Sequence, residues 1–298
     1  MECVICGSKQ LETVDTVISD FVMSRIRPNF QERQATKLCF CRECTFAFYA
    51  YRLTLEEEGR LYHNYRDAAY QAERERYECW YTKKVNDAIN STGTEEQTIV
   101  IENIVNRHVD WELKSALDYG GNKGASFTQR LGTEAKYVFD ISGVETLPGI
   151  TPISDPENLK RHRYDFIMCN MVFEHLSDPN DTMEKLMEIG DSRTIYYIEV
   201  PSENPFLGKN KFSIQQNLQL LFNRNYSPFR LVKYYFVQTR QPFMPMKEHV
   251  NFFSPQSIRT LVERHGFHVL EVQENTENTP LGRSVVLSVL FKKIGERS

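Results

Sequence analysis

Four of the seven cysteines in this 298-residue chain form two CxxC pairs. The first pair is Cys3 and Cys6, and the second is Cys41 and Cys44. Two such pairs on separate turns can bring four thiolates to the corners of a tetrahedron, which is the arrangement that zinc prefers. Four thiolates leave no open coordination position, so we expect a structural Zn²⁺ site rather than a catalytic one. The alternative is a set of unrelated cytosolic thiols.

A second group of residues lies in the stretch DYGGNKG, which follows a run of apolar residues. A glycine-rich turn between a strand and a helix lets the backbone approach a ligand closely. The dinucleotide pattern GxGxxG requires glycine at positions 120, 122 and 125, and only Gly120 meets it. The pattern acid-x-Gly-x-Gly-x-Gly fits better, because Asp118, Gly120 and Gly124 match and Asn122 replaces only the middle glycine. This second pattern is typical of S-adenosylmethionine sites, and a turn that binds no ligand is the alternative.

Asp140 ends the next predicted strand, sixteen residues after Gly124. An acid at that position can accept hydrogen bonds from two ribose hydroxyls, a geometry that nicotinamide and adenosyl cofactors share. Asp140 therefore supports a nucleoside-containing ligand without distinguishing between the two classes. A capping or loop role is the alternative for this residue.

Three further residues are candidates for catalysis. Transfer of a methyl group from a sulfonium to a hydroxyl or a carbon acid needs a group that removes a proton, and histidine has a pKa near neutrality. His249 is the first candidate because it follows a long aromatic-rich segment that could hold a substrate. His175 and its neighbour Glu174 follow a predicted strand and are the next candidates. A loop histidine bonded to backbone is the alternative for His249, and a structural role is the alternative for His175.

The elements that would position these residues alternate between strand and helix. Apolar runs and turn signals predict two sets of elements. We expect strands over residues 114–119, 135–141, 151–154, 164–170, 194–201, 267–275 and 284–293. We expect helices over residues 98–111, 124–132, 178–190 and 254–266. Such alternation indicates an α/β fold with a doubly wound, Rossmann-like sheet and helices on both faces.

The composition divides the chain into three parts. Residues 1–50 form the predicted zinc-binding domain, in which the β-branched and aromatic stretch 16–26 could supply strands between the two CxxC pairs. Residues 51–92 are charged and rich in tyrosine, and we interpret them as a helical linker or lid. Residues 93–298 form the predicted cofactor-binding domain, with a substrate insertion at 202–250.

The overall balance of residues excludes some classes of protein. The net charge of −4 gives no basic surplus, so nucleic acid is not an expected partner. The first ten residues lack the blocks of a signal peptide, and no apolar run approaches the roughly 18–20 residues of a membrane span. We therefore expect a cytoplasmic protein with thiols rather than disulfides.

At DYGGNKG, at Asp140, and in YDFIMCNMVFEHLSDP (164–179) the chain resembles class I S-adenosylmethionine-dependent methyltransferases. The stretches EVPSE (199–203) and HVNFFSPQSIRTLVERHGF (249–267) are similar to further segments of that family. The two CxxC pairs resemble the zinc-binding N-terminal domain of a branch that methylates sugars. The resemblance implies a methyltransferase sheet preceded by a small zinc-ribbon-like domain, with S-adenosylmethionine and Zn²⁺ as cofactors.

The resemblance also assigns roles within the cofactor site. It implies that the methionine part is lined by the loop residues Asp118, Gly120, Gly121 and Gly124. It places Asp140 at the ribose, Asp155 near the adenine amine, and Asn170 beside the cofactor at the end of the fourth strand.

The leading hypothesis is a methyltransferase that acts on a carbohydrate, either a nucleotide-linked sugar or a surface-glycan unit. One alternative is an RNA or protein methyltransferase that uses the zinc module for recognition. Another is a catalytically inactive binding protein with the methyltransferase fold. A nicotinamide oxidoreductase is disfavoured by the glycine spacing. The aromatic and basic residues of 202–248 could hold the substrate or form a homodimer contact.

Overall fold

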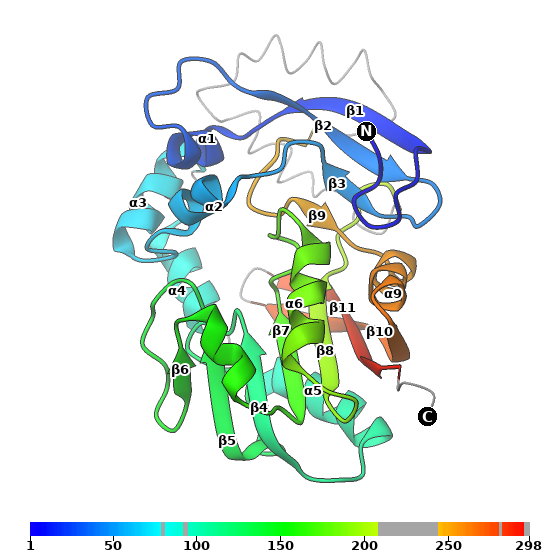
Figure 1. The fold of residues 1–298 in the computed structure, drawn as a ribbon. Helices are drawn as coiled ribbons and strands as arrows, with labels where there is room; N and C mark the ends of the chain where they lie inside the picture. Colours follow the sequence, from blue (N-terminus) through cyan, green and yellow to red (C-terminus); the bar gives the residue numbers. More distant parts are fainter. Residues whose placement is uncertain (79–80, 92–94, 208–243, 280–281, 295–298) are drawn as a thin grey trace.

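The computed structural model describes residues 1–78, 81–91, 95–207, 244–279 and 282–294. They form a four-stranded sheet with the order β1-β2-β3-β9 and a seven-stranded sheet with the order β10-β11-β8-β7-β4-β5-β6. The smaller sheet lies above the larger one, and helices α1 to α4 lie along one side (Figure 1). Within these ranges no helix combines the length and the apolar character needed to cross a bilayer.

The larger sheet reverses its strand order beside β4. From β4 the chain continues outward to β5 and β6, and it then returns to place β7 and β8 on the other side of β4. Open α/β sheets bind ligands at the carboxyl ends of the strands flanking such a switch point. The five parallel strands are β4 (Leu113–Tyr119), β5 (Leu131–Phe139), β6 (Thr151–Ile153), β7 (Phe166–Asn170) and β8 (Ile195–Pro201). β11 (Gly282–Lys293) is antiparallel to both β8 and β10 (Phe267–Thr279).

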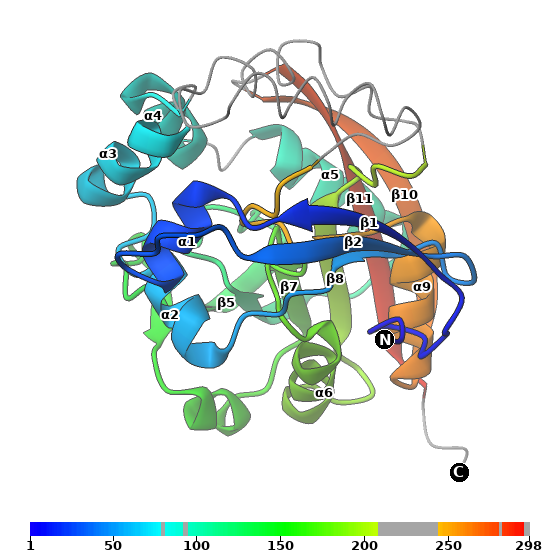
Figure 2. The same ribbon diagram turned by 90° about the horizontal axis from the view of Figure 1, so that it is seen from above.

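Helices cover both faces of this sheet. Helix α5 (Glu95–His108) lies on one face, and α6 (Pro179–Ile189) and α9 (Pro255–Arg264) lie on the other (Figure 2). The strand side chains divide accordingly, because successive residues of a strand point to opposite faces. In β7, Phe166 and Met168 pack in the cluster that includes α5, whereas Ile167 and Cys169 pack in the cluster that includes α6 and α9. The predicted doubly wound α/β fold is confirmed.

The smaller sheet joins distant parts of the chain. β1 (Leu11–Val17), β2 (Ala35–Cys41) and β3 (Ala47–Tyr49) form an antiparallel meander. β9 (Asn251–Phe252) pairs with β3, and Ile18 forms an isolated bridge with Met246. The division at residue 50 stays a prediction, since this sheet also includes residues from the end of the predicted insertion. Of that insertion, residues 208–243 lie outside the described ranges.

The expectation of strand over residues 16–26 is wrong beyond Val17. Residues Asp20–Ile26 form helix α1, in which the side-chain oxygen of Ser19 accepts a hydrogen bond from the backbone of Val22. This cap, together with an apolar helix face that packs on α2 and α3, outweighs the β propensity of single residues. The neighbouring helices are α2 (Leu55–Tyr62), α3 (Ala68–Tyr77) and α4 (Lys83–Ser91).

The expected helix over residues 124–132 is also wrong. Residues 122–126 form turns, and β5 begins at Leu131. Gly124 and Gly132 have φ values of 79° and 63°, which a right-handed helix excludes. Between them, Thr128 accepts a hydrogen bond from the backbone of Arg130 through its hydroxyl oxygen, a local turn that competes with helix formation. The loop after β4 therefore leads directly into the next strand.

The remaining features are a short helix after β6 and the two ends of α9. A 3₁₀ helix, η1 (Pro156–Arg161), follows β6. Helix α9 begins as expected at Ser254, whose side-chain oxygen accepts a hydrogen bond from the backbone of Ser257 at 3.0 Å. The chain turns after this helix at Gly266, which has a φ of 76°.

Candidate functional site

Asp118 lies at the carboxyl end of β4 and is fully buried. Neither carboxylate oxygen has a hydrogen-bond partner within the described part of the chain. Burial, and to a lesser extent the charge of Asp140, raise the pKa of Asp118 to about 8. Buried carboxyl groups are normally satisfied by donors. An unsatisfied carboxyl group at the switch point therefore fits a ligand that brings a donor or a positive charge.

The loop after β4 comes so close to its neighbours that three positions exclude a side chain. A Cβ atom at Gly121 would lie 2.3 Å from Cγ of Asp118, and one at Gly120 would lie 2.5 Å from Cγ2 of Val172. Gly120 also has a φ of 79°. A third loop position, Gly124, is equally restricted, since its Cβ atom would lie 2.5 Å from Cδ1 of Ile150. The three glycines thus give the loop a shape that no other residue reproduces.

Asp140 holds this loop from the neighbouring strand. Its Oδ2 accepts a hydrogen bond from the backbone N–H of Asn122 at 2.8 Å, and its Oδ1 accepts one from the backbone N–H of Ser142 at 2.7 Å. Each carboxylate oxygen has a second lone pair for a ligand hydroxyl. Asn122 has a φ of 52°, a left-handed conformation that asparagine tolerates better than most residues. The replacement of the middle glycine by asparagine therefore preserves the turn.

Asn170 ends β7, Asp155 lies two residues beyond the end of β6, and the two differ in their surroundings. Both polar atoms of the Asn170 amide are buried and have no partner among the described residues. The structure thus places a second unsatisfied polar group on β7, next to the strand of Asp118. Asp155 is exposed and caps η1 by accepting a hydrogen bond from the backbone of Glu157 at 3.0 Å.

The three predicted catalytic residues converge beyond this edge. Glu174 and His175 follow β7, and His249 precedes β9. One potential ligand atom from each of the three lies within 4.8 Å of the others. The rings of His175 and His249 meet edge to face, with their centroids 4.7 Å apart.

The pKa values within this cluster are strongly perturbed. Burial favours the neutral ring of His249, but the carboxylate of Glu203 on its Nδ1 outweighs burial and holds its pKa at about 9. Burial and the nearby charge of His249 lower the pKa of His175 to about 3. Burial raises the pKa of Glu174 to about 7. Near neutral pH the cluster therefore combines a cationic ring, a neutral ring and a carboxyl group that is close to its midpoint.

Three residues of the cluster were not predicted as site residues. Glu203 bonds to Nδ1 of His249, while Nδ1 of His175 lies 3.1 Å from both the hydroxyl of Tyr62 and the backbone oxygen of Glu248. The sequence offered one signal for Glu203, because it lies two residues beyond the end of β8 at the carboxyl edge of the sheet. Tyr62 belongs to α2 and lies in the tyrosine-rich stretch that the sequence predicts as a helical linker or lid.

The four predicted zinc ligands come together. Their sulfur atoms all lie within 4.8 Å of one another. The Sγ atoms of Cys3 and Cys44 are 3.6 Å apart, and those of Cys6 and Cys41 are 3.5 Å apart. Cys39 is buried outside this group, and its sulfur lies 3.3 Å from that of Met1.

The two turns that carry these cysteines have matching backbones. Gly7 and Thr45 follow the second cysteine of each pair and have φ values of 75° and 59°. Their backbone N–H groups donate to the carbonyl oxygens of Cys3 and Cys41, both at 2.9 Å. Equivalent turns facing each other are what a tetrahedral four-cysteine site requires.

The cysteine cluster is attached to the helices of the large sheet. The hydroxyl of Thr45 lies 2.6 Å from the hydroxyl of Ser254 at the start of α9. The amide of Asn180 in the first turn of α6 donates to the backbone oxygen of Val4 at 2.7 Å. The cluster therefore connects the N-terminal turns to the two helices on one face of the sheet.

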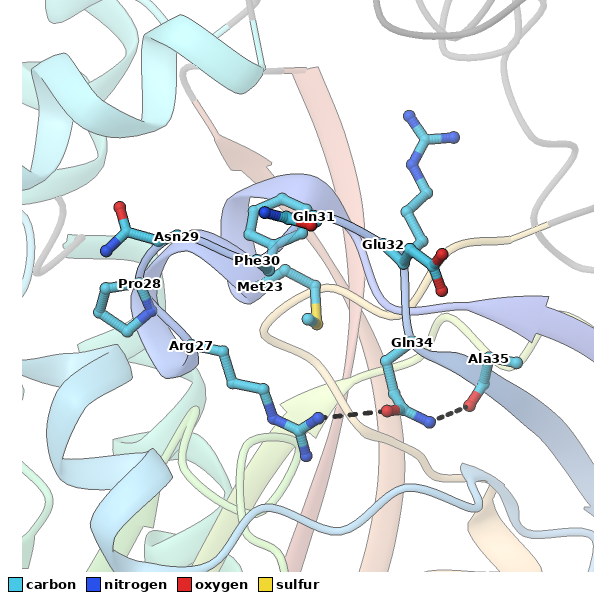
Figure 3. A pocket seen from close by; sticks show the side chains of 10 residues that line it. Met23, Arg27, Pro28, Asn29, Phe30, Gln31, Glu32, Gln34 and Ala35 are labelled. Carbon is cyan, nitrogen blue, oxygen red and sulfur yellow. Dashed lines mark hydrogen bonds between the residues drawn. The ribbon is translucent and has the colours of Figure 1, made fainter.

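A surface hollow of about 490 Å³ lies elsewhere, around the segment between α1 and β2 (Figure 3). Its polar groups are already bonded within the protein. Arg27 donates to the side chain of Gln34, which donates to the backbone oxygen of Ala35, each at 3.2 Å. Arg33 donates to both carboxylate oxygens of Asp20. Its lining contains none of the predicted site residues. We assign it no role in the chemistry.

Comparison with solved structures gives low similarities. A SAM-dependent methyltransferase from Anabaena variabilis is 14% identical, with a TM-score of 0.43, covering 74% of this chain and 94% of its own. One from Aquifex aeolicus is 16% identical, with a TM-score of 0.41, and the match covers 65% of this chain and 89% of the other. One from Methanosarcina mazei is 12% identical, with a TM-score of 0.41, and the match covers 65% of this chain and 98% of the other. The sequence matches no curated protein.

Comparison with protein families gives a match that spans most of the chain. Residues 70–272, about two thirds of the sequence, match the family described as "Methyltransferase domain". The matched range contains the loop after β4, Asp140, Asn170 and the cluster around His249. The chain therefore belongs to the methyltransferase domain family and is an S-adenosylmethionine-dependent methyltransferase.

Proposed function

We propose that this enzyme methylates a carbohydrate, either a nucleotide-linked sugar or a surface-glycan unit. The observation that carries the proposal is the paired His249 and Glu203, which suits an acceptor that must lose a proton, such as a hydroxyl or a carbon next to a carbonyl. The carbohydrate class is supported by the similarity of the CxxC pairs to those of sugar methyltransferases. The mildly acidic chain gives no support for a nucleic-acid acceptor.

The residues at the switch point fit the cofactor. The two carboxylate oxygens of Asp118, which have no partner among the described residues, would pair with the ammonium of the methionine part, beside Gly120, Gly121 and Gly124. Asp140 would accept from the ribose hydroxyls, Asn170 would supply its unsatisfied amide, and Asp155 would lie near the adenine amine. When bound, S-adenosylmethionine supplies a methyl group that is activated by its sulfonium.

A single segment links the cofactor site to the cluster that contains the proposed base. Val172 closes against Gly120, and two residues later Glu174 begins the catalytic cluster. His249 would take the acceptor proton at Nε2, because its Nδ1 is engaged by Glu203. The resulting imidazolium is stabilised by that carboxylate. His175 would stay neutral and form the wall of the site, and Glu174 would add negative potential.

We propose that the four-cysteine cluster binds Zn²⁺ and has a structural role. Four sulfur atoms within 4.8 Å cannot all ionise without a cation between them, and zinc supplies the compensating charge. A site of this type contributes on the order of 10 kcal/mol to local folding. It would fix the first turns of α6 and α9 through Asn180 and Ser254.

We propose a cytoplasmic location, because a cysteine cluster suited to binding zinc needs a reducing compartment. The six cysteines in the described ranges form no disulfide with one another. We propose a small-molecule or glycan acceptor that is held by the predicted insertion. The alternative role of this insertion is a homodimer contact.

Calorimetric titration with S-adenosylmethionine, S-adenosylhomocysteine and NAD tests the cofactor, with Asp140→Ala as the variant. We expect the two adenosyl ligands to bind to the parent protein and to lose affinity in the variant. Incubation with S-adenosylmethionine and panels of sugar nucleotides, RNA and peptides then tests the acceptor by mass spectrometry. Methylation of RNA or peptide but of no sugar would overturn the carbohydrate proposal.

A further inference from the structure

We propose that Glu174, His175 and His249 also form a binding site for a divalent transition-metal ion, and that this ion competes with the acceptor proton for His249. The proposal of a metal-binding site rests on the geometry of the cluster alone. The competition rests on the proposed function, in which His249 is the base.

The donor set and its spacing suit such an ion. Two imidazoles and one carboxylate are preferred ligands of Zn²⁺, Co²⁺, Ni²⁺ and Fe²⁺. One ligand atom from each residue lies within 4.8 Å of the others, and Nε2 of His175 lies 3.9 Å from Oε1 of Glu174. Metal bonds of about 2.1 Å place neighbouring ligand atoms about 3.4 Å apart, so small side-chain rotations are enough to close the site.

The outer hydrogen bonds of both histidines match those of metal ligands. A metal-bound histidine usually donates its other ring N–H to a carboxylate or a backbone carbonyl. Nδ1 of His249 bonds to the carboxylate of Glu203, and Nδ1 of His175 lies 3.1 Å from the backbone oxygen of Glu248. Both bonds leave Nε2 as the nitrogen that is available for a metal.

One carboxylate oxygen of the third ligand, Glu174, has no partner among the described residues. Oε2 of Glu174 is buried without a hydrogen bond inside the described ranges, and the residue is 2% exposed. The carboxylate of Glu203 adds negative charge, while that of Glu248 is already paired with Arg74 at 2.6 Å. A divalent cation would satisfy the free oxygen of Glu174 and neutralise this excess of negative charge.

The cluster differs from the cysteine site in being open. The side chain of His249 is 36% exposed, so an ion can enter from solvent. Three protein ligands leave coordination positions for water or substrate oxygens, whereas four thiolates leave none. An ion on Nε2 of His249 would block proton transfer to that atom, so we expect micromolar transition metals to inhibit the enzyme.

The test is titration of the zinc-loaded protein with Co²⁺, followed by its visible absorbance. Cobalt on nitrogen and oxygen ligands gives weak d–d bands, and cobalt displacing zinc from cysteine gives intense thiolate bands, so the two sites are distinguishable. We expect one equivalent of weak-band cobalt to bind to the parent protein. Glu174→Gln and His175→Gln should each weaken binding at least about tenfold.

His268→Gln is the matched control, because it removes an exposed histidine on β10 and should leave the titration unchanged. Absence of weak-band binding, or equal binding in all variants, would overturn the proposal. Cobalt that binds without inhibiting methyl transfer would overturn the competition alone. Cobalt binding in a protein that methylates no acceptor would leave the metal site standing and count against the proposed function.

Discussion

The Nδ1 atom of His249 hydrogen-bonds to the carboxylate of Glu203, a residue 46 positions earlier in the chain. Glu203 follows β8 of the large sheet, whereas His249 leads into β9 of the small sheet. The bond therefore fixes which ring nitrogen is free at the junction of the two sheets. It also keeps a proton on the ring at neutral pH, because the carboxylate stabilises the imidazolium.

This bond predicts the pH profile of methyl transfer. In the proposed mechanism His249 accepts a proton only when its ring is neutral, so activity should rise with pH as the ring loses its proton near its raised pKa of about 9. The charged and titratable groups facing it are Glu203, Glu174, Glu248 and His175. In Glu203→Gln the rising limb should move down by about one to two pH units.

Glu73→Gln is the matched control for that measurement, since Glu73 pairs with Arg25 in the helical region and does not touch the cluster. Its profile should coincide with that of the parent enzyme. A Glu203→Gln enzyme with lower kcat and an unmoved limb would show that Glu203 acts only on structure.

The buried carboxyl group of Asp118, proposed to bind the cofactor, is expected to lower the stability of the ligand-free protein at high pH. Its folded-state pKa of about 8 lies above the usual value, so the ligand-free protein should lose stability as pH rises from about 4 to 8. Asp118→Asn removes this dependence and should raise the free energy of unfolding at pH 8 by a few kcal/mol, on the order of the linkage energy. Urea unfolding across pH measures this effect. A variant that is equally pH-sensitive would show that Asp118 is not the titrating group.

Substitution of Gly121 is expected to distort the loop after β4 through a steric clash with Asp118. The new methyl group of Gly121→Ala would meet Cγ of Asp118 at 2.3 Å, so the loop must shift. Cofactor affinity should fall by roughly fivefold to a hundredfold, for a strain of about 1–3 kcal/mol. Calorimetry with S-adenosylhomocysteine measures the loss. Gly59→Ala in α2 meets no atom within 4 Å and should bind normally, with a gain in stability of up to about 1 kcal/mol. Equal affinities in the two variants would contradict the steric argument.

The cysteine cluster predicts one zinc ion per chain and a dependence of folding on it. Metal analysis of Cys41→Ser should show loss of zinc, and thermal unfolding should show a much lower Tm, because the cluster anchors α6 and α9. Cys39→Ala changes a buried cysteine outside the cluster and should retain zinc with a smaller loss of stability. Zinc retained at full occupancy in Cys41→Ser would refute the assignment.

Local patterns in the sequence were enough to predict the class of fold and most of its elements. The strands over 164–170 and 194–201 and the helix that begins at Ser254 depend on short-range signals, namely apolar runs and caps. The paired spacing of the cysteines and the order of Asp118, Gly120 and Gly124 are likewise local. Local patterns failed where two conformations compete within a few residues, as in the turns after Gly124, where no helix forms.

The tertiary structure alone brought together the proposed catalytic cluster. Glu174, Glu203 and His249 come from three segments, and nothing in the sequence of one segment specifies its distance from another. Their meeting follows from two long-range events: the parallel pairing of β7 with β8, and the addition of β9 to the N-terminal sheet. Both depend on burying apolar faces over the whole chain, and a burial energy summed over many contacts leaves no signature at any single residue.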